Sequence, residues 1–427
     1  MKRFLVQIVI LAFLIGCLPV SASQADSGDS YTDAQCVECH EDKPDDHAAS
    51  VHKDIECLEC HTQAAEEDHE EMPSVDCRQC HAPHDEKSIH DAHTRVACNA
   101  CHIKGGVPAA EPGSDRIIWS GTFRPGSTIG IHQALRPQGE ELCAKCHFQG
   151  NSLGAASMIL PAKSILCMPC HVATFSVSDT TTLVSLFIFL IGIIGLCAVW
   201  FSATLGFPIP SFEFRDLFSG KFAHLLNTLI FDVFLLQRFF RLSPVRWIIH
   251  ALIFFPFLFR FIFGLTALLL SIYLPDWPLS VAMLDKNHAV RACFFDLTGI
   301  MILTGVALAI GRERKAQIEA SSLPEPGWAM PVLLGLIVLA GFILEGLRIA
   351  MTGWPAGTEW AFLGYGVSLM FKGMTGLTDT YGYVWYLHAI LVGTFIALIP
   401  FTRMSHIITA PISLIVNARA EAHANIK

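Results

Sequence analysis

The sequence has little positive charge, with 29 Lys and Arg residues against 38 Asp and Glu residues and a net charge of −9 over 427 residues. Proteins that bind nucleic acid present a basic surface, and aromatic side chains often lie between its cations. No cluster of Lys and Arg in this chain is interleaved with aromatic residues in that way. The composition therefore indicates that nucleic acid is not a partner.

Charge is scarce beyond about residue 180, where apolar runs dominate, so the chain divides into a polar first half and an apolar second half. Each of five runs is long enough to cross about 30 Å of hydrocarbon as a helix, which requires about 20 residues. The five runs lie near residues 183–203, 247–273, 291–310, 329–350 and 383–403. A shorter stretch, residues 222–237, contains His224 and Asp232 and predicts an interfacial or cytoplasmic helix.

The N-terminus is typical of a secretory signal peptide, which we assign to residues 1–25. Two basic residues precede an apolar run over residues 4–18, and small residues follow at positions 21–23. Residues 14–17 resemble the lipobox of bacterial lipoproteins and would leave Cys17 as a lipidated N-terminus. Cleavage after the small residues and an uncleaved anchor are the alternatives. The signal peptide predicts export.

Few cysteines are left over for disulfides, because twelve of the fifteen lie in six CxxCH motifs. Two thiols at this spacing add to the vinyl groups of haem, and the adjacent His becomes the proximal iron ligand. One such motif could be a redox dithiol or half of a zinc site, but neither requires the His, so six repeats predict six covalent c haems. The attachment cysteines are Cys36, Cys39, Cys57, Cys60, Cys77, Cys80, Cys98, Cys101, Cys143, Cys146, Cys167 and Cys170. The proximal ligands are His40, His61, His81, His102, His147 and His171.

The motifs form an internal repeat. The first cysteines of successive motifs are 21, 20 and 21 residues apart, and gaps of 45 and 24 residues follow. About 20 residues per haem are too few for a conventional apolar core, so haem must supply most of the buried surface. The expected fold is mostly α, with a haem-dominated periplasmic multihaem cytochrome c domain over residues 26–178 and a five-helix transmembrane bundle over residues 180–420.

The sixth iron ligand separates electron carriers from enzymes, because an open iron binds substrate whereas a bis-His iron only passes electrons. Seven further histidines are candidates for six irons, so at least one must be a surface residue: His47, His52, His69, His84, His90, His93 and His132. His52 and His93 each precede the next motif by five residues. This spacing resembles the low-potential, bis-His multihaem cytochromes c typified by the tetrahaem cytochromes of sulfate reducers. No CxxCK motif marks a catalytic haem, which disfavours a terminal reductase.

The distribution of Lys and Arg between the loops predicts the orientation. If the haem domain is periplasmic, then among the loops between spans and the C-terminal tail, the cytoplasmic ones carry most of the Lys and Arg residues. The positive-inside rule requires this bias. These cations are Arg215, Lys221, Arg238, Arg241, Arg312, Arg314, Lys315, Arg419 and Lys427. The opposite side has only Lys286 and Lys372 between spans. We therefore expect a bacterial inner-membrane protein with the haem c domain in the periplasm.

The membrane half resembles the cytochrome b (gamma) subunit of respiratory nitrate reductase and its relatives, the membrane subunits of heterodisulfide reductase and of sulfate-reducer transmembrane complexes. The resemblance covers roughly residues 180–420 and is carried by residues 246–250, which end in His250, by His388, and by residues 399–406, which end in His406. His388 and His406 are eighteen residues apart, as in that family, or about 27 Å along a helix. Because spans two and five run in opposite directions, His250 and His406 lie at one level, and the resemblance implies one bis-His b haem between them.

One position departs from that pattern. The family has a second His ten residues after His250, but this sequence has Arg260 there. His388 therefore lacks its usual partner. It could form a second b haem with His288, bind quinone, or be an interior polar residue, so the expectation is one or two b haems.

Four charged residues, Arg260, Asp296, Glu345 and Arg348, lie within predicted spans, where charges are expensive and usually functional. One interpretation is an ion pair between Arg260 and either carboxylate that only holds helices together. The other is a quinol pocket in which Glu345 or Asp296 accepts a proton while His388 bonds a quinol oxygen.

The predicted function is electron transfer between the quinone pool, with menaquinone as the expected quinone, and periplasmic c haems that serve a donor or acceptor cytochrome. The chain would be a quinol-linked oxidoreductase or its electron-transfer subunit, embedded in membrane lipid, with either direction of electron flow allowed. The alternative is a subunit of a transmembrane redox complex that relays electrons to or from a cytoplasmic iron–sulfur partner, because relatives of the membrane half dock such a partner. A sensor or structural anchor is disfavoured because no signalling domain follows the last span.

Overall fold

The computed structural model forms two compact units, Met1–Cys77 and Arg78–Lys427, which are described separately. It describes residues 32–41, 43–48, 50, 52–62, 64, 75–80, 93, 95–103, 106–111, 116–123, 140–177, 179–204, 226–274, 277–319 and 327–424. The predicted signal peptide and several predicted site residues lie outside this range: Cys17, His69, His81, His84, His90 and His132.

The first unit has three short helices, α2 (Asp33–Cys39), α3 (Lys43–Ala48) and α4 (Cys57–Cys60). Thr32 and Gln35 form a capping box that begins α2. The side chain of Asp33 then joins two helices, because its Oδ1 accepts a hydrogen bond of 2.9 Å from the backbone N–H of Cys57. No hydrophobic side chain among the described residues of this unit is buried, so protein atoms alone supply little core there.

The second unit begins with short elements around the third to sixth motifs. They are η1 (Cys77–Gln79), which starts at the last residue of the first unit, α5 (Cys98–His102), β1 (Gly106–Ala110), β2 (Ile117–Phe123), α6 (Glu140–Cys143) and η3 (Ile165–Cys167). The two strands are antiparallel, with Pro108 opposite Trp119 and an irregularity between Gly106 and Pro108. This hairpin lies in the Gly- and Pro-rich gap between motifs and was not predicted.

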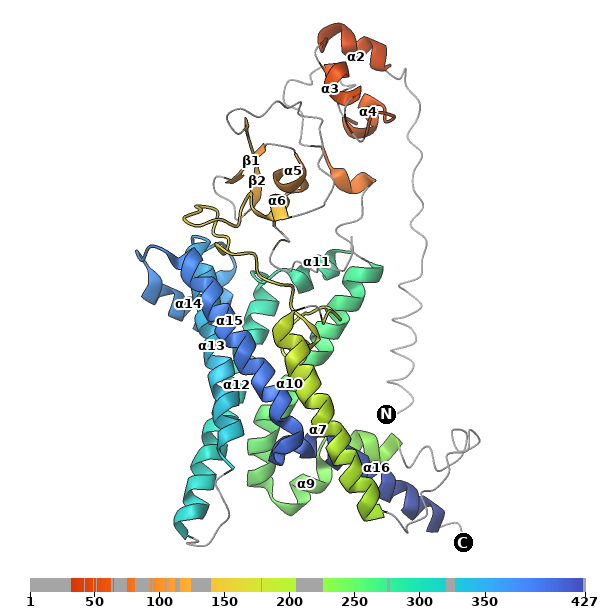
Figure 1. The fold of residues 1–427 in the computed structure, drawn as a ribbon, viewed down its shortest axis with the longest axis vertical. Helices are drawn as coiled ribbons and strands as arrows, with labels where there is room; N and C mark the ends of the chain where they lie inside the picture. Colours follow the sequence, from red (N-terminus) through yellow and green to blue (C-terminus); the bar gives the residue numbers. More distant parts are fainter. Residues whose placement is uncertain are drawn as a thin grey trace, which may run out of the picture. The chain divides into compact units, whose positions relative to one another are not determined.

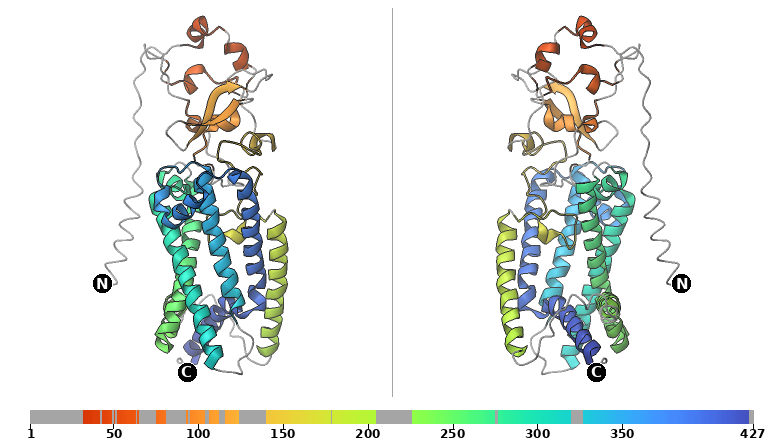
Figure 2. Two further views of the ribbon diagram at one scale, coloured as in Figure 1. Left: turned by 90° about the vertical axis from the view of Figure 1, so that its left-hand side faces the viewer. Right: turned by 90° about the vertical axis from the view of Figure 1, so that its right-hand side faces the viewer.

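Five helices are long and apolar enough to cross a membrane, which confirms the predicted five spans within the described residues (Figure 1). They are α7 (Thr180–Thr204), α10 (Pro244–Tyr273), α12 (Ala289–Glu319), α13 (Ala329–Met351) and α15 (Leu377–Leu398). The helices lie side by side along a common direction (Figure 2). Neighbours contact one another in the order α10, α12, α13, α15 and α7.

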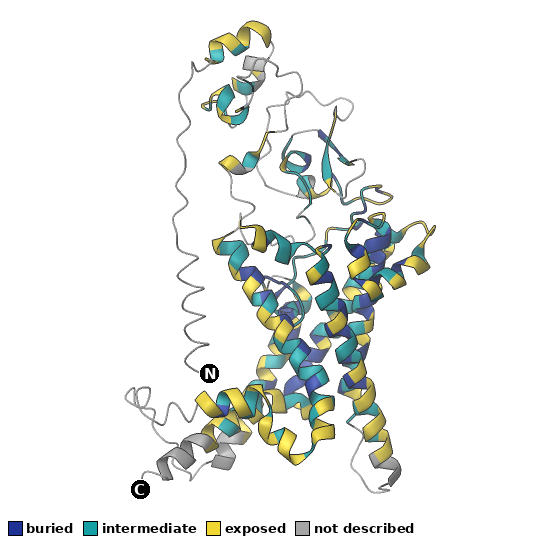
Figure 3. Ribbon diagram, turned by 180° about the vertical axis from the view of Figure 1, so that it is seen from behind, coloured by how far each residue is buried: buried dark blue, intermediate teal, exposed yellow. Residues whose placement is uncertain are grey.

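The largest core cluster lies between α12, α13 and α15. It comprises Ile302, Val306, Met330, Leu334, Ile337, Phe395 and Ile399. The opposite faces of the same helices are exposed and apolar (Figure 3), and the most exposed side chains of α7 include Phe187 and Ile194. Such contiguous apolar surface is expected where lipid replaces water as the solvent.

The helix ends follow from local chemistry. Ser243 caps α10 by accepting a hydrogen bond from the N–H of Arg246, and Pro244 occupies the first turn, where its missing N–H is harmless. The carboxylate of Asp179 accepts hydrogen bonds from the N–H and hydroxyl of Thr182 and begins α7 in the same way. Gly376, with φ of 72°, makes the left-handed turn into α15.

Shorter elements connect the spans. They are η5 (Leu229–Phe234), α9 (Gln237–Leu242), α11 (Pro278–Leu284), η6 (Thr358–Trp360), α14 (Phe362–Ser368), η7 (Leu369–Phe371), η8 (Ile399–Phe401), η9 (Arg403–Ser405) and α16 (His406–Ala424). The stretch predicted as a non-spanning helix is described from residue 226 onward, where it is helical through η5. We call the end of the bundle near α11 and α14 the motif end, because residues 140–177 adjoin it, and the end near α9 and α16 the opposite end.

Candidate functional site

Three pairs of histidines from distant parts of the second unit have nearly the same ring separation. The centroids of His93 and His147 are 6.1 Å apart, those of His171 and His388 are 6.3 Å apart, and those of His250 and His406 are 6.0 Å apart. A metal–imidazole bond is about 2.0–2.1 Å and a ring nitrogen lies roughly 1 Å from its centroid, so two axial imidazoles on one iron have centroids about 6 Å apart. All three pairs thus fit the spacing of a bis-His haem.

The first pair joins the fifth CxxCH motif to a residue that precedes the fourth. Nδ1 of His147 lies 2.7 Å from the carbonyl oxygen of Ala156. Because a carbonyl can only accept, Nδ1 carries the proton and Nε2 is left free for a metal. Lys145, within the same motif, is buried and donates to the carbonyls of Cys101 and Ile103, which holds the fourth and fifth motifs together.

The pair formed by His250 and His406 lies at the opposite end of the bundle. His250 is six residues inside α10, and His406 begins α16. Nδ1 of His406 lies 2.7 Å from the carbonyl oxygen of Arg403, so its Nε2 is also left free for a metal. Nδ1 of His250 is buried and has no hydrogen-bond partner among the described residues. Leaving such a group unpaired costs about 1–3 kcal/mol, which a ligand would offset.

The third pair, His171 and His388, was not expected. His171 belongs to the sixth CxxCH motif, whose chain lies against the helices at the motif end, just before α7 (Figure 2). A Cβ at Gly264 of α10 would come within 2.8 Å of the carbonyl oxygen of His171, so glycine permits this close approach. Nδ1 of His388 is buried without a hydrogen-bond partner in the described structure. His288, the alternative partner of His388, is exposed just before α12.

In the first unit, the predicted ligands His40, His47, His52 and His61 all fall within described residues. His61 is half-buried, and burial followed by the neighbouring charge of His40 lowers its pKa. Neutral imidazole is the form that binds a metal. The backbone N–H of His52 donates to Ser50 Oγ at 3.0 Å. None of the described motif cysteines in either unit forms a disulfide.

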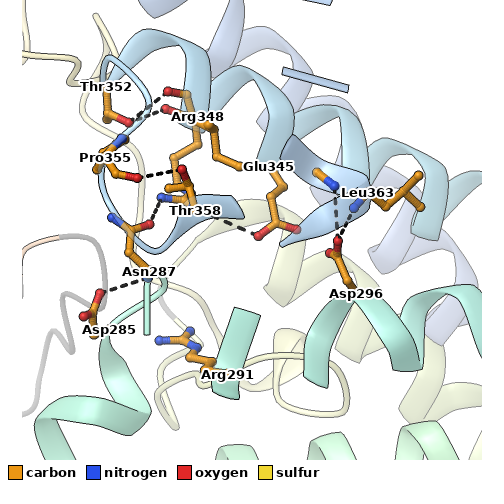
Figure 4. A network of polar contacts seen from close by, with 12 residues as sticks. Asp285, Asn287, Arg291, Asp296, Glu345, Arg348, Thr352, Pro355, Thr358 and Leu363 are labelled. Atoms are coloured by element: carbon orange, nitrogen blue, oxygen red, sulfur yellow. Dashed lines mark hydrogen bonds and ion pairs between the residues drawn. The ribbon is translucent and has the colours of Figure 1, made fainter. Parts of the chain in front are cut away.

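A polar network lies at the motif end and includes Asp296, Glu345 and Arg348, three of the charged residues expected within the spans (Figure 4). Asp296 is fully buried, and its Oδ2 accepts hydrogen bonds from the backbone N–H groups of Leu363 (2.6 Å) and Gly364 (3.2 Å) at the start of α14. Its Oδ1 has no donor among the described residues. The carboxyl of Glu345 lies beside it and interacts with it. A proton shared between the two carboxyls would supply the missing donor.

Arg260 forms no ion pair with either carboxylate within the described structure. Its Nε donates to the Thr298 hydroxyl at 2.7 Å, and a terminal nitrogen donates to the carbonyl of Phe295. The guanidinium carbon also lies 4.9 Å from the centroid of the Phe295 ring, a cation–π contact. Hydrogen bonds from the guanidinium to neutral oxygens therefore take the place of the ion pair between helices. The carboxyls of Asp296 and Glu345 face each other instead.

The network continues from Glu345 toward the surface of the motif end. Arg348 lies 3.8 Å from Glu345 Oε1 and donates to Asn287 Oδ1 at 2.7 Å. The N–H of Asn287 donates to Asp285 Oδ1 at 2.9 Å, and Asp285 forms an ion pair of 2.7 Å with Arg95. Hydrogen-bonding groups thus run from the buried carboxyls to the segment that precedes the fourth motif.

Asp285 is the outermost carboxylate of this network. Burial alone would raise its pKa, but hydrogen bonds from Arg95 and the backbone of Asn287, together with the positive charges of Arg95 and Arg291, outweigh burial and lower the pKa. The carboxylate is therefore ionised near neutral pH, and its pair with Arg95 ties the fourth-motif segment to the loop before α12.

Comparison with known proteins bears on the membrane half. Residues 255–421 match the family model described as nitrate reductase gamma subunit. The chain is 26% identical over 204 residues to the E subunit of the dihydromethanophenazine:CoB–CoM heterodisulfide reductase of Methanosarcina thermophila, which covers 46% of this chain and 68% of that protein. The same protein of Methanosarcina mazei is 25% identical over 207 residues, covering 46% and 69%. No solved structure matches the chain.

These similarities confirm the membrane part of the predicted resemblance, which is to membrane subunits of redox enzymes. The multihaem character of the first half stays a prediction. Sequence reasoning missed the contact of His171 with His388, the amide groups of α14 that hold Asp296, and the pair of Arg95 with Asp285. CxxCH spacing gave no signal for these contacts, because each joins segments far apart in the chain.

Proposed function

We propose that the chain is a membrane-bound oxidoreductase that transfers electrons between the quinone pool and periplasmic c-type haems attached at the six CxxCH motifs. The observation that carries the proposal is the pairing of His250 with His406 at a separation of 6.0 Å. His406 lies within residues 255–421, which match the nitrate reductase gamma subunit model, and His250 lies just before them. Gamma subunits of that family bind haem b. When bound, haem supplies one-electron redox chemistry.

The chain's own residues have separate tasks in this proposal. His250 and His406 hold haem b, with Arg403 fixing the orientation of the His406 ring through its carbonyl. The twelve motif cysteines and the adjacent histidines hold haem c. Menaquinol is the expected reductant, because low-potential bis-His c haems suit a low-potential quinol.

Asp296 and Glu345 are proposed to bind the protons that quinol releases when it loses two electrons and two protons to become quinone. Their support is the buried, donor-free Oδ1 of Asp296 beside the second carboxyl. Arg348, Asn287 and Asp285 then offer a hydrogen-bonded route toward the motif end, which the positive-inside distribution assigns to the periplasm. Arg260 has the task of positioning α10 against α12 through Thr298 and Phe295.

The test is reduction of the purified full-length protein by a menaquinol analogue, followed through the b and c absorption bands. Reduction of both bands, with His406→Ala losing the b band and Arg403→Gln retaining it as a control, would support the proposal. Arg403→Gln is matched because its backbone carbonyl, which His406 uses, is unchanged. Reduction of every haem by dithionite but of none by the quinol analogue would overturn it.

A second candidate is a component of a transmembrane complex that exchanges electrons with a cytoplasmic iron–sulfur partner. It is favoured by the similarity to proteins named as the E subunit of heterodisulfide reductase. Purification in mild detergent separates the two candidates. A second chain that co-purifies with non-haem iron and sulfide would favour the complex, whereas a single chain with full quinol activity would favour the oxidoreductase.

A further inference from the structure

The sixth CxxCH motif lies inside the membrane bundle and not only beside it. Met168 within the motif and Ala173 just after it form a buried cluster with Leu268 of α10, and Cys167 packs against it. Val172 is 2% exposed. The ring of His171 stacks on Phe295 of α12 with centroids 6.2 Å apart and planes 13° apart. A group attached to this motif must therefore lie among α10, α12 and α15.

We propose that His388 is the second axial ligand of the c haem attached at Cys167 and Cys170. The proposal rests on the proposed function in one respect, that the CxxCH motifs carry haem. His171 is the proximal ligand that this motif provides, and the ring of His388 faces it at 6.3 Å with planes 69° apart. The separation matches that of the two other pairs, His93 with His147 and His250 with His406.

Ring separation alone does not require a metal, since aromatic rings in ordinary contact have centroids about 4.5–7 Å apart. The motif to which His171 belongs distinguishes the two cases. A haem attached at Cys167 and Cys170 takes His171 as its proximal ligand, and the ring of His388 lies 6.3 Å from that ring, which is the span of two imidazoles on one iron. The imidazole of His388, in the middle of a membrane helix, also hydrogen-bonds to the backbone of Ile337. A carbonyl that accepts from one ring nitrogen leaves the other for a metal, as at His147 and His406.

The surroundings of the pair agree with this assignment. Arg260 is close enough to Cys170 for an electrostatic interaction, so the sixth motif occupies the side of α10 where a second b-haem ligand was expected. His288 is exposed outside the spans, whereas His388 lies within α15. The site that a second b haem would need on α15 is thus taken by a haem that arrives from the preceding chain.

With His388 as this ligand, the haems would form a path for electrons through the bundle. His250 and Gly264, which adjoins His171, are fourteen residues apart on α10, or about 21 Å along its axis. The haem of the sixth motif would lie between the haem at the opposite end and the haems outside the bundle. This haem would also lie near Asp296 of α12 and Glu345 of α13. The protein would then hold six c haems and one b haem, with the sixth c haem inside the membrane.

The closing experiment substitutes His388 in the full-length protein and examines the dithionite-reduced form. In His388→Ala, mass spectrometry should still find a haem on the peptide containing Cys167 and Cys170. One c haem should become high-spin and bind carbon monoxide, and the b-haem content should not change. In His388→Met, all haems should stay six-coordinate, and one c haem should titrate at a higher potential, as Met ligation produces. His288→Ala should leave every spectrum as in the wild type.

Three results would overturn the proposal. One is a fully low-spin set of c haems in His388→Ala. Another is the loss of a b haem in that variant, which would make His388 a b-haem ligand. The third is absence of haem from the sixth motif in the wild type. Because dithionite replaces quinol as reductant, a protein inactive with quinol would contradict the proposed function and leave this test intact. If His388→Ala does not fold, the potentials of His388→Met decide, and unchanged potentials overturn the proposal.

Discussion

The rings of His93 and His147 are perpendicular, with centroids 6.1 Å apart, although the two residues are separated by the fourth motif and the hairpin of β1 and β2. His93 precedes the fourth motif by five residues, a position where multihaem cytochromes commonly place a distal ligand. In this structure its ring lies against that of His147 in the fifth motif. The distal ligand of a motif therefore need not be the histidine that precedes that motif by five residues.

The first prediction follows from this pair. His93→Ala should convert one c haem to a high-spin form that binds carbon monoxide, while the number of covalently attached haems stays at the wild-type value. His52→Ala should affect a different iron, because an iron held by His147 and His93 already has both of its imidazole ligands. The double variant should therefore show two high-spin haems. Electron paramagnetic resonance and carbon monoxide difference spectra measure both. Low-spin spectra for every c haem in His93→Ala would contradict the pairing.

The second prediction concerns His250 and His406. His250→Ala and His406→Ala should each abolish the same b-type signal, and the double variant should lose no more than either single variant. All c haems should remain attached, because their thioether bonds involve neither His250 nor His406. Redox-titrated absorption spectra provide the measurement, with His288→Ala as the control. A full b-haem signal in His406→Ala would remove the basis for the membrane site.

The sequence predicted the parts of the molecule that depend on local chemistry. Apolar length set the five spans, and the structure places their ends within six residues of the predicted limits. Helix direction and rise per residue predicted that His250 and His406 lie at the same depth in the bundle. Their ring centroids are 6.0 Å apart in the structure. Contacts such as that of His171 with His388 could not be predicted, because they depend on how a loop returns into the bundle. The pairing of Arg260 was equally undetermined, since neutral hydrogen-bond partners leave no charge pattern.

The third prediction addresses the carboxyls. Asp296→Asn should slow quinol oxidation by about 100-fold, the lower range for loss of a proton-transfer group, while the fold is retained. The amide oxygen can still accept from the N–H groups of Leu363 and Gly364, but the side chain can no longer take a proton. Asp296→Ala should in addition destabilise the protein by about 1–3 kcal/mol for each amide left without an acceptor.

Glu359→Gln is the matched control, because Glu359 is an exposed carboxylate in η6 at the same end of the bundle. Its quinol oxidation rate should equal that of the wild type. Stopped-flow reduction by a menaquinol analogue, with thermal unfolding of each variant, measures both effects. An Asp296→Asn variant with the wild-type rate would show that this carboxyl does not accept the proton.

The fourth prediction concerns Arg95 and Asp285. Arg95→Gln should lower the stability of the second unit by about 1 kcal/mol, the upper range for partly exposed pairs. Because the pKa of Asp285 is lowered in the folded protein, the contribution of the pair is fully present above the usual Asp pKa of about 3.9. The contribution is lost only as the pH falls through the lower, folded value. The difference between wild type and variant should therefore be constant from pH 7 to pH 5.

Thermal unfolding followed at several pH values checks this dependence. Glu313→Gln, which removes the more exposed pair of Glu313 with Arg403 at 3.3 Å, should have a smaller effect. A difference that disappears between pH 7 and pH 5 would mean that another group, with a pKa in that range, controls the contact.

The central claim is that one chain carries c haems on its six motifs and a b haem between His250 and His406. Pyridine haemochrome spectra of the purified full-length protein, combined with the mass of the denatured chain, test it most directly because the two haem types absorb at different wavelengths. The account predicts six covalent c haems per chain, one for each CxxCH motif, and one b haem. Fewer than five covalent haems from a strain with intact cytochrome maturation, or no b haem, would contradict it.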